Sequence, residues 1–329
     1  MHEEMRSVIL KQAEQIRHSI EVNKDASVSG DFDAIILAGM GGSGHPGDLL
    51  NALHLPTVPL TVHRSYSLPY TLGKNPLTII SSYSGNTEEA LSAYEDAKTK
   101  NQPILVNTAG GKLLELAKQN SSPYSFIDYP GMQPRHTLFA SFTGLAVALA
   151  NSKLAKNIST ELQKTADMID REVAAIETPA KALADTLVGK TPVFYSSDAM
   201  GFAAKNMKIQ TNENAKTAAF WNEFPELNHN EMVGMTNPQA AFHAVFLRTT
   251  TDHPQIAVRM NVTKKMYETW GVKVTEVQIK GTSLLEQISY AVVFGLWTTY
   301  HLALNYKTDP IPVKGVEDFK NKLKELTEK

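Results

Sequence analysis

Residues 79–89 read Ile-Ile-Ser-Ser-Tyr-Ser-Gly-Asn-Thr-Glu-Glu, and they indicate the fold class because an apolar strand ends and a helix begins within them. Ser82, Ser84 and Thr87 place three hydroxyl groups around the turn, and Thr87 suits the N-cap of the helix. Hydroxyls and backbone amides at a helix start can bind a phosphate monoester without a lysine. The same hydroxyls could serve only to cap the helix, so the residue chemistry leaves both interpretations open.

A glycine-rich junction lies upstream of this stretch. The apolar residues 34–37 predict a short strand, and residues 39–44, Gly-Met-Gly-Gly-Ser-Gly, follow directly. Glycines permit a tight turn and let backbone amides approach a ligand, so Gly42 and Ser43 are candidate phosphate contacts. A plain strand–helix turn and a dinucleotide site both fit the same spacing. Residues 59–64 hold no acidic side chain for a ribose hydroxyl, which makes a nicotinamide-dependent dehydrogenase the weakest alternative.

Short apolar runs alternate with helical segments, which predicts an α/β fold with doubly wound, mostly parallel sheets flanked by helices. The rhythm restarts near residue 192 after a helix-rich stretch, so we expect a duplicated fold divided into residues 1–152 and 153–329. The expected strands are residues 34–37, 59–63, 77–82, 103–107, 124–127, 192–195, 218–221, 241–247 and 272–277. The expected helices include an amphipathic one at the N-terminus, residues 87–98, 112–118, 201–210 and 284–305, and a charged one at the C-terminus.

The composition narrows the class of protein. The 329 residues carry a formal net charge of −2, so they give no electrostatic sign of a nucleic-acid or membrane partner. The absence of cysteine excludes disulfides, thiolate catalysis and cysteine-based metal sites. No stretch resembles the apolar core of a signal peptide or the roughly 20 apolar residues of a membrane span, so we expect a cytoplasmic protein.

Two polar clusters in the second half are candidates for proton transfer. Glu213 lies between two asparagines after the expected helix 201–210, where it is either a base held by hydrogen bonds or a solvated glutamate. His229 lies between two asparagines, in a setting too polar for a core helix, and its pKa near neutrality suits proton transfer. A zinc site with Glu226 or Glu231 is the alternative, but no second histidine follows until residue 243.

Arg135 is a further candidate. Pro134 suits the first position of a helix, which places Arg135 at a helix start. A cation there opposes the helix dipole, so its presence suggests a function rather than a contribution to stability. The alternative is an ordinary surface salt bridge.

Residues 82–89 resemble the phosphosugar-binding signature of sugar isomerase (SIS) domains. The surrounding chain, from about residue 31 to 312, is more closely similar to the bifunctional phosphoglucose/phosphomannose isomerase family. The segments that carry this similarity are Gly39–Gly44, Leu68-Pro69, Gly110-Gly111-Lys112-Leu113, Gln133-Pro134-Arg135, Asn212-Glu213-Asn214-Ala215-Lys216 and Glu226–Glu231.

The resemblance implies two SIS subdomains with flavodoxin-like sheets and a homodimer with a shared active site. It implies a phosphosugar substrate, no metal and no nucleotide cofactor. The implied reaction interconverts fructose 6-phosphate with glucose 6-phosphate and mannose 6-phosphate through an enediolate. A regulatory module that binds a phosphosugar without turnover, an isomerase of another phosphosugar and a SIS amidotransferase are the alternatives; the last would need a cysteine nucleophile from another chain.

The resemblance also implies residue roles. Glu213 would move the proton between C2 and C1, His229 would open the sugar ring, and Arg135 would stabilise the enediolate. Lys307 would contact the substrate, although Lys307-Thr308 stands where the family has Gly-Val. The implied phosphate contacts are Gly42, Ser43, Ser82, Ser84 and Thr87.

Overall fold

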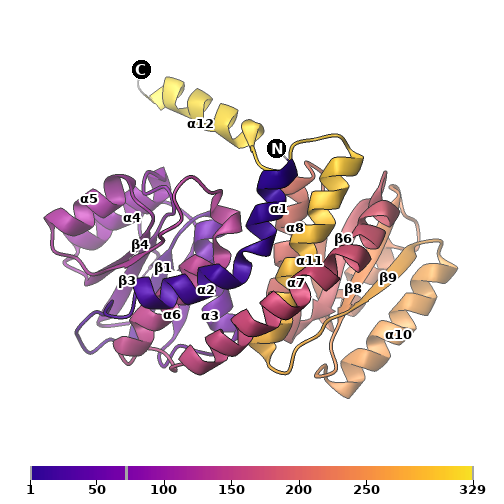
Figure 1. Ribbon diagram of the computed structural model, residues 1–329, viewed down its shortest axis with the longest axis horizontal. Coiled ribbons are helices and arrows are strands. Elements are labelled where there is room, and N and C mark those ends of the chain that lie inside the picture. The colour runs from indigo at the N-terminus through magenta and orange to yellow at the C-terminus, as the bar shows by residue number, and fades with distance from the viewer. Residues whose placement is uncertain (1, 71–72, 328–329) are drawn as a thin grey trace. The chain divides into compact units, whose positions relative to one another are not determined.

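The computed structural model describes residues 2–70 and 73–327 and divides the chain into two compact units (Figure 1). One unit comprises Lys11–Asp170, and the other comprises Arg171–Lys329 together with Met1–Leu10. The division between the units lies inside the long helix α7 (Ser159–Leu187), whereas the sequence placed it at residue 152. The N-terminal segment also joins the second unit, which no local sequence pattern indicates.

The unit of residues 11–170 contains a five-stranded parallel sheet in the order β2-β1-β3-β4-β5. The chain reverses its direction across the sheet between β1 and β3, and ligands of such sheets bind at the carboxyl ends of strands at this point. The elements are α2 (Gln12–Val22), β1 (Ala34–Ala38), the 3₁₀ helix η1 (Gly41–Gly44), α3 (His45–Ala52), β2 (Leu60–His63), β3 (Pro76–Ser81), α4 (Glu88–Thr99), β4 (Ile104–Thr108), α5 (Gly111–Gln119), β5 (Tyr124–Phe126), η2 (Pro134–His136) and α6 (Leu138–Asn151).

Every residue of β1 and β3 is buried, as expected for central parallel strands that are covered on both faces. Helices α4 and α5 cover one face, where Tyr94 and Leu113 pack against Ile80 and Val106. Helix α6 covers the other face and packs against α2 and α3. Because both faces of the sheet are covered, functional loops are expected at the ends of its strands.

The second unit contains a four-stranded parallel sheet in the order β7-β6-β8-β9. This order repeats that of the first four strands of the other sheet, in agreement with the duplicated rhythm of the sequence. The elements are α1 (His2–Leu10), β6 (Thr191–Ser197), η3 (Asp198–Met200), α8 (Gly201–Asn214), β7 (Phe220–Phe224), η4 (Glu226–His229), α9 (Glu231–Gly234), β8 (Phe242–Arg248), α10 (Pro254–Thr269), β9 (Lys273–Gln278), α11 (Leu284–Asn305) and α12 (Lys314–Thr327).

Aromatic side chains fill the core between the second sheet and α10. The rings of Tyr195, Phe224, Phe246 and Tyr267 meet at centroid distances of 5.4–6.4 Å, mostly edge to face. Helices α8 and α11 pack together, and α1 lies against α11. Although α11 is long and buried, the part of the chain that the structure describes contains no helix apolar enough over sufficient length to span a membrane.

Three expected elements differ from the observed ones. Helix α8 continues to Asn214 instead of ending near residue 210, because the buried Asn214 amide donates to Thr299 Oγ1 at 2.9 Å. Strand β7 begins at Phe220 instead of residue 218, because Lys216 adopts a left-handed turn (φ 53°) after the helix. The N-terminal helix is interrupted at Lys11, where no side chain caps α2.

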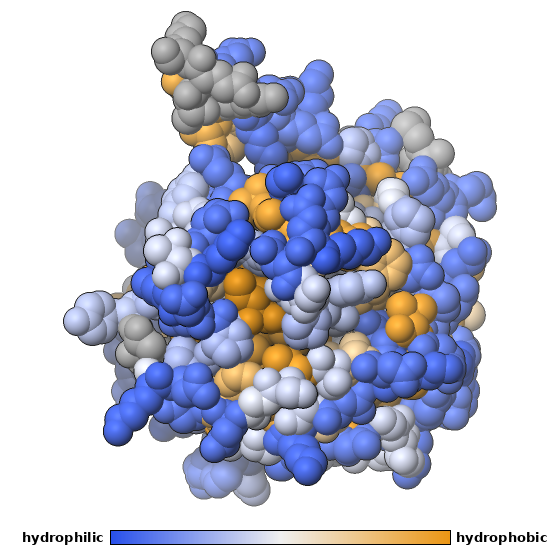
Figure 2. All heavy atoms as spheres, turned by 90° about the vertical axis from the view of Figure 1, so that its left-hand side faces the viewer, coloured by the Kyte–Doolittle hydropathy of each residue, from blue (hydrophilic) through white to orange (hydrophobic). Residues whose placement is uncertain are grey.

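The face of the protein in Figure 2 is largely hydrophilic, and hydrophobic side chains gather in a smaller area near its middle. This distribution agrees with sheets whose apolar residues are buried in the cores of the two units.

Candidate functional site

The two junctions singled out in the sequence meet at the carboxyl ends of β1 and β3. Residues 41–44 form η1 directly after β1, and residues 82–87 form the loop between β3 and α4. Ser43 Oγ accepts a hydrogen bond from the Tyr83 backbone amide at 3.0 Å, which joins the two loops. They occupy the strand ends where open parallel sheets bind ligands.

The hydroxyls of the second loop bond to the loop rather than to the helix. Ser82 Oγ donates to Thr87 Oγ1 at 3.0 Å and accepts from the Gly85 amide at 3.1 Å. Ser84 Oγ accepts from the Asn86 amide at 3.3 Å. Thr87 is the N-cap residue of α4 by its backbone, but its side chain makes no capping hydrogen bond. Capping therefore does not explain why these hydroxyls cluster at the start of α4.

The glycine pair Gly110-Gly111, at the start of α5, lies in close contact with the hydroxyl loop. Gly85 has a φ of 68°, and a Cβ at this position would lie 1.8 Å from the carbonyl oxygen of Gly110. The start of α5 is bonded to the loop, because the Leu113 amide donates to the Gly85 carbonyl and the Lys112 amide donates to Asn86 Oδ1, both at 3.0 Å. Gly110-Gly111 thus has a structural role that the sequence resemblance alone did not reveal.

Arg135 is buried within η2, beside the glycine-rich junction. A Cβ on Gly42 would lie 3.1 Å from the Arg135 backbone nitrogen, so the glycine allows the two segments to approach. Tyr83 ties the hydroxyl loop to the same segment, since its hydroxyl donates to the Tyr129 carbonyl at 2.6 Å and accepts from the Met132 amide at 2.8 Å. Gly42, Ser43, the hydroxyl loop and the Arg135 segment therefore form one constellation.

Tyr83 is a site-building residue that the sequence reasoning missed. Its only signal was an aromatic residue between two serines of the motif. Burial raises the pKa of the Tyr83 hydroxyl, so it remains a neutral donor at physiological pH.

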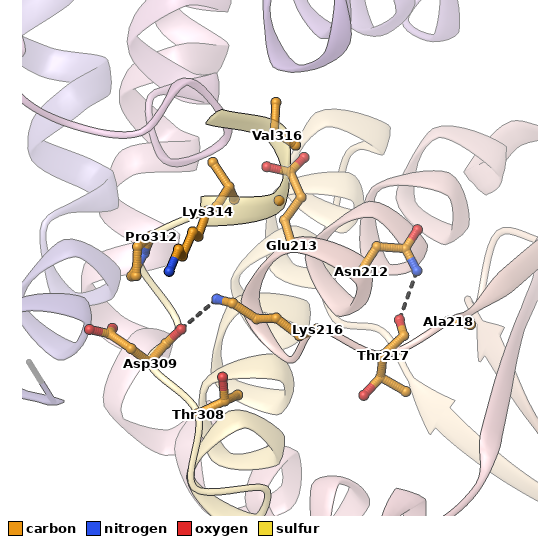
Figure 3. A pocket seen from close by; sticks show the side chains of 12 residues that line it. Asn212, Glu213, Lys216, Thr217, Ala218, Thr308, Asp309, Pro312, Lys314 and Val316 are labelled. Atoms are coloured by element: carbon orange, nitrogen blue, oxygen red, sulfur yellow. Dashed lines mark hydrogen bonds between the residues drawn. The ribbon is translucent and has the colours of Figure 1, made fainter. Parts of the chain in front are cut away.

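Glu213 occupies the last turn of α8 and lines a pocket of about 650 Å³ (Figure 3). The neighbouring amides fix the end of this helix: Asn212 Nδ2 donates to the Thr217 carbonyl at 2.8 Å, and Asn214 Nδ2 donates to Thr299. The pocket is lined by Asn212, Glu213, Lys216, Thr217, Ala218, Thr308, Asp309, Pro312, Val313, Lys314, Gly315 and Val316.

The segment that follows α11 forms the opposite wall of this pocket. Lys216 Nζ donates to the Asp309 carbonyl and, at 3.2 Å, to the Asn214 carbonyl, which attaches the segment to the end of α8. Figure 3 shows Lys314 and Val316, at the start of α12, on the side to which the Glu213 side chain points. Lys307 is exposed and is not one of the lining residues, whereas Lys216 and Lys314, which the sequence reasoning did not select, are.

His229 lies on a different edge of the second sheet. It is exposed in η4, just beyond the carboxyl end of β7, and it does not line the Glu213 pocket. Helix α8 starts after the carboxyl end of β6 and returns to the amino end of β7, so Glu213 lies at the amino edge. A helix of 14 residues is about 21 Å long, so the structure does not bring Glu213 and His229 of one chain together.

The carboxylates near His229 are engaged elsewhere. Both oxygens of Glu231 accept hydrogen bonds at 2.5 Å, one from the Tyr195 hydroxyl and one from Asn222 Nδ2. Glu226 Oε1 accepts from Asn230 Nδ2 at 2.6 Å. Within residues 2–70 and 73–327, no three histidine, aspartate or glutamate side chains are grouped as a metal site would require.

The corresponding crevice of the second sheet is acidic. Asp252 lies there with one oxygen bonded to Ser197 Oγ at 2.7 Å and the other to the Thr249 amide at 2.8 Å. Burial, together with the charge of Asp198, raises the pKa of Glu223, which lies near the carboxyl end of β7 and against Gly201 at the start of α8. Carboxylates thus lie at the strand ends of the second sheet, whereas hydroxyls cluster at the strand ends of the first.

Comparison with known proteins gives consistent results. A family model described as the C-terminal SIS domain of bacterial phospho-glucose isomerase matches residues 176–323. The bifunctional phosphoglucose/phosphomannose isomerase of Caldicellulosiruptor bescii is 37% identical over 330 residues, covering 95% of this chain and 97% of that protein. The D-glucosamine-6-phosphate 4-epimerase of Sulfolobus acidocaldarius is 36% identical over 202 residues, covering 61% of this chain and 63% of that protein. A hypothetical protein from Thermus thermophilus shares the fold, with a TM-score of 0.74 at 14% identity over 97% of this chain and 89% of its own.

Proposed function

Because the chain belongs to the bifunctional phosphoglucose/phosphomannose isomerase family, we propose that it interconverts fructose 6-phosphate with glucose 6-phosphate and mannose 6-phosphate. The observation that carries this proposal is the hydroxyl loop at the start of α4. Ser82, Ser84 and Thr87 cluster there, the Thr87 side chain does not cap the helix, and Ser43 joins the loop from the neighbouring strand end. Hydroxyls and amides at a helix N-terminus suit the phosphate of the substrate.

Isomerisation then requires a proton to move between C2 and C1 of the open-chain sugar. Glu213 is the proposed base, because it is a carboxylate in a pocket whose helix end is fixed by Asn212 and Asn214. Arg135 is the proposed partner of the enediolate, whose negative charge a guanidinium stabilises. In this scheme Lys307, which is exposed, is a substrate contact only at the rim of the site.

Ring opening is assigned to His229, which protonates the ring oxygen of the cyclic substrate. His229 and Glu213 lie at opposite edges of one sheet, so we infer that a second copy of the chain supplies the histidine. The proposal therefore includes a homodimer with shared active sites, in the cytoplasm, acting without a metal or nucleotide cofactor.

A coupled assay tests the proposal with EDTA-treated protein, fructose 6-phosphate as substrate and separate detection of glucose 6-phosphate and mannose 6-phosphate. We expect both products. Glu213→Gln should lower kcat at least about 100-fold, because an amide cannot accept the proton. Glu95→Gln is the matched control, since Glu95 is an exposed glutamate on α4 and its loss should leave kcat unchanged. Equal activity of the Glu213→Gln variant and wild type would refute the role of Glu213.

Another phosphosugar is the second candidate substrate. The similarity to a D-glucosamine-6-phosphate 4-epimerase covers 61% of the chain at 36% identity, so the assay should include glucosamine 6-phosphate. Turnover of that compound without formation of glucose 6-phosphate or mannose 6-phosphate would replace the proposed reaction. Binding of fructose 6-phosphate without any turnover would instead support a regulatory module.

A further inference from the structure

The carboxylate of Glu231, two residues after His229, is held firmly by the second sheet. The Tyr195 hydroxyl on β6 donates to one oxygen and Asn222 Nδ2 on β7 donates to the other, both at 2.5 Å. Tyr195 is fully buried in the aromatic core, and burial raises the pKa of its hydroxyl far above the ordinary value. Tyr195 is therefore a permanent donor, and the bonds to Glu231 are of the strong, charge-assisted kind.

The residue on the other side of His229 is anchored as well. Asn228 Nδ2 donates to Thr263 Oγ1 at 2.8 Å, and Asn228 Oδ1 accepts from Arg259 Nη1 at 3.3 Å. Both partners belong to α10. The backbone is thus attached to the unit immediately before and shortly after His229, whereas the imidazole itself is exposed.

We propose that Glu231 is a positioning residue for His229, fixing the direction in which the imidazole is presented to the substrate. This inference rests on the proposed function, in which His229 opens the sugar ring. Glu231 starts the short helix α9, and its carboxylate attaches that helix to β6 and β7. Without this attachment, the hydrogen bonds of Asn228 and the burial of Leu227 would hold the segment that carries His229.

The ionised carboxylate is essential to this role, because both of its oxygens face donors. A glutamine at residue 231 would carry no charge, so its oxygen could accept from Asn222 and its NH₂ group could donate to the Tyr195 hydroxyl, but both bonds would lose their charge-assisted strength. A looser His229 would slow protonation of the ring oxygen, whereas transfer of the C2 proton by Glu213 would not change. The two steps can therefore be separated experimentally.

Enzyme-catalysed exchange between the α and β anomers of glucose 6-phosphate requires ring opening but no transfer of the C2 proton. It can be measured by NMR exchange spectroscopy in the Glu213→Gln background. There we expect His229→Asn to abolish catalysed exchange. Glu231→Gln and Tyr195→Phe should each lower it about tenfold, the effect of losing one charge-assisted hydrogen bond. The double variant should be slowed by less than the product of the two single effects, because the two changes weaken the same attachment.

Tyr267→Phe is the matched control. Tyr267 belongs to the same buried aromatic cluster, and its hydroxyl lies beside that of Tyr195, but the hydrogen bonds to Glu231 come from Tyr195 and Asn222. The Tm of Tyr267→Phe should fall no further than that of Tyr195→Phe. Its rate of anomer exchange should equal that of the Glu213→Gln parent. This comparison remains decisive if Glu231→Gln does not fold.

The possible failures are distinguishable. If wild type forms no isomerisation product, or if His229→Asn leaves anomer exchange intact, the proposed function fails. If His229→Asn abolishes exchange but Glu231→Gln and Tyr195→Phe match Tyr267→Phe, the positioning role is overturned while the proposed function stands. Additive effects of Glu231→Gln and Tyr195→Phe would also overturn it.

Discussion

Replacing Gly85 with alanine tests whether the hydroxyl loop depends on close contact with the start of α5. Gly85 has a φ of 68°, a conformation that costs a residue with a Cβ about 1–2 kcal/mol. The added Cβ would lie 1.8 Å from the Gly110 oxygen, so the backbone must move. That movement breaks the bond between the Leu113 amide and the Gly85 carbonyl, worth about 1 kcal/mol. We therefore expect a loss of about 2–3 kcal/mol in the free energy of unfolding.

Gly131→Ala is the control for the conformational part of this cost. Gly131 lies in the same unit and has a φ of 76°, but a Cβ there would meet nothing within 4 Å. It should lose only about 1–2 kcal/mol. For a unit of this size, about 1 kcal/mol lowers Tm by about 2–4 °C.

Scanning calorimetry should therefore show a decrease in Tm of about 4–12 °C for Gly85→Ala and about 2–8 °C for Gly131→Ala, with the larger decrease in Gly85→Ala. Inorganic phosphate should protect wild type and Gly131→Ala against heat, and protect Gly85→Ala less, because only that variant distorts the hydroxyl loop. Equal losses of Tm and equal protection in the two variants would refute the role assigned to the contact between Gly85 and Gly110.

Two further predictions concern single side chains. Thr87→Val should raise KM for fructose 6-phosphate about tenfold with little loss of Tm, because the Thr87 hydroxyl bonds to Ser82 rather than capping α4; a capping role would instead appear as about 1 kcal/mol of lost stability with KM unchanged. Burial opposes ionisation of Glu276, but hydrogen bonds from Lys264 and Arg248 outweigh it and lower its pKa. The contribution of ionised Glu276 to the free energy of unfolding is present above the ordinary carboxyl pKa and is lost as pH falls through the lowered value. In urea, the free energies of unfolding of Glu276→Gln and wild type should therefore differ at pH 7 and converge below about pH 4.

The sequence predicted the sheets well because their central strands are covered on both faces. Largely apolar runs such as residues 34–37 and 77–80 favour buried strands, and glycines or hydroxyl residues follow them closely. The meeting of the two loops also followed from the sequence, since carboxyl ends of neighbouring parallel strands share one edge. Local patterns were sufficient for this part of the site.

The remaining features depend on contacts between residues far apart in the chain. The last turn of α8, which carries Glu213, exists because Asn214 bonds to Thr299, 85 residues later. The sequence around residue 210 does not indicate that Thr299 is the partner of Asn214. Likewise, Lys314 rather than Lys307 lines the pocket because Lys216 holds the Asp309 segment against α8.

The separation of Glu213 and His229 shows how sequence distance can mislead. His229 follows Glu213 by only 16 positions, a separation that suggests two residues close together in a single site. Strand β7 runs between them, however, so the first belongs to the amino edge of the sheet and the second to the carboxyl edge. A parallel sheet makes this unavoidable, because each crossover helix returns the chain to the opposite edge.

The two sheets repeat one strand order, yet their crevices have opposite chemistry. The first has the hydroxyls of Ser43 and Ser82 at its strand ends, whereas the second has the carboxylates of Asp252 and Glu223. We therefore expect a phosphate to bind at the first crevice rather than at the second, so that duplication of the fold does not duplicate the proposed phosphate site. In the proposed mechanism the second sheet instead supplies the proton-transfer groups, Glu213 at one edge and His229 at the other. Since neither edge contains both groups, pairing two copies of the chain is the simplest way for one substrate to meet both, and the proposed shared active site rests on this topology rather than on any single motif.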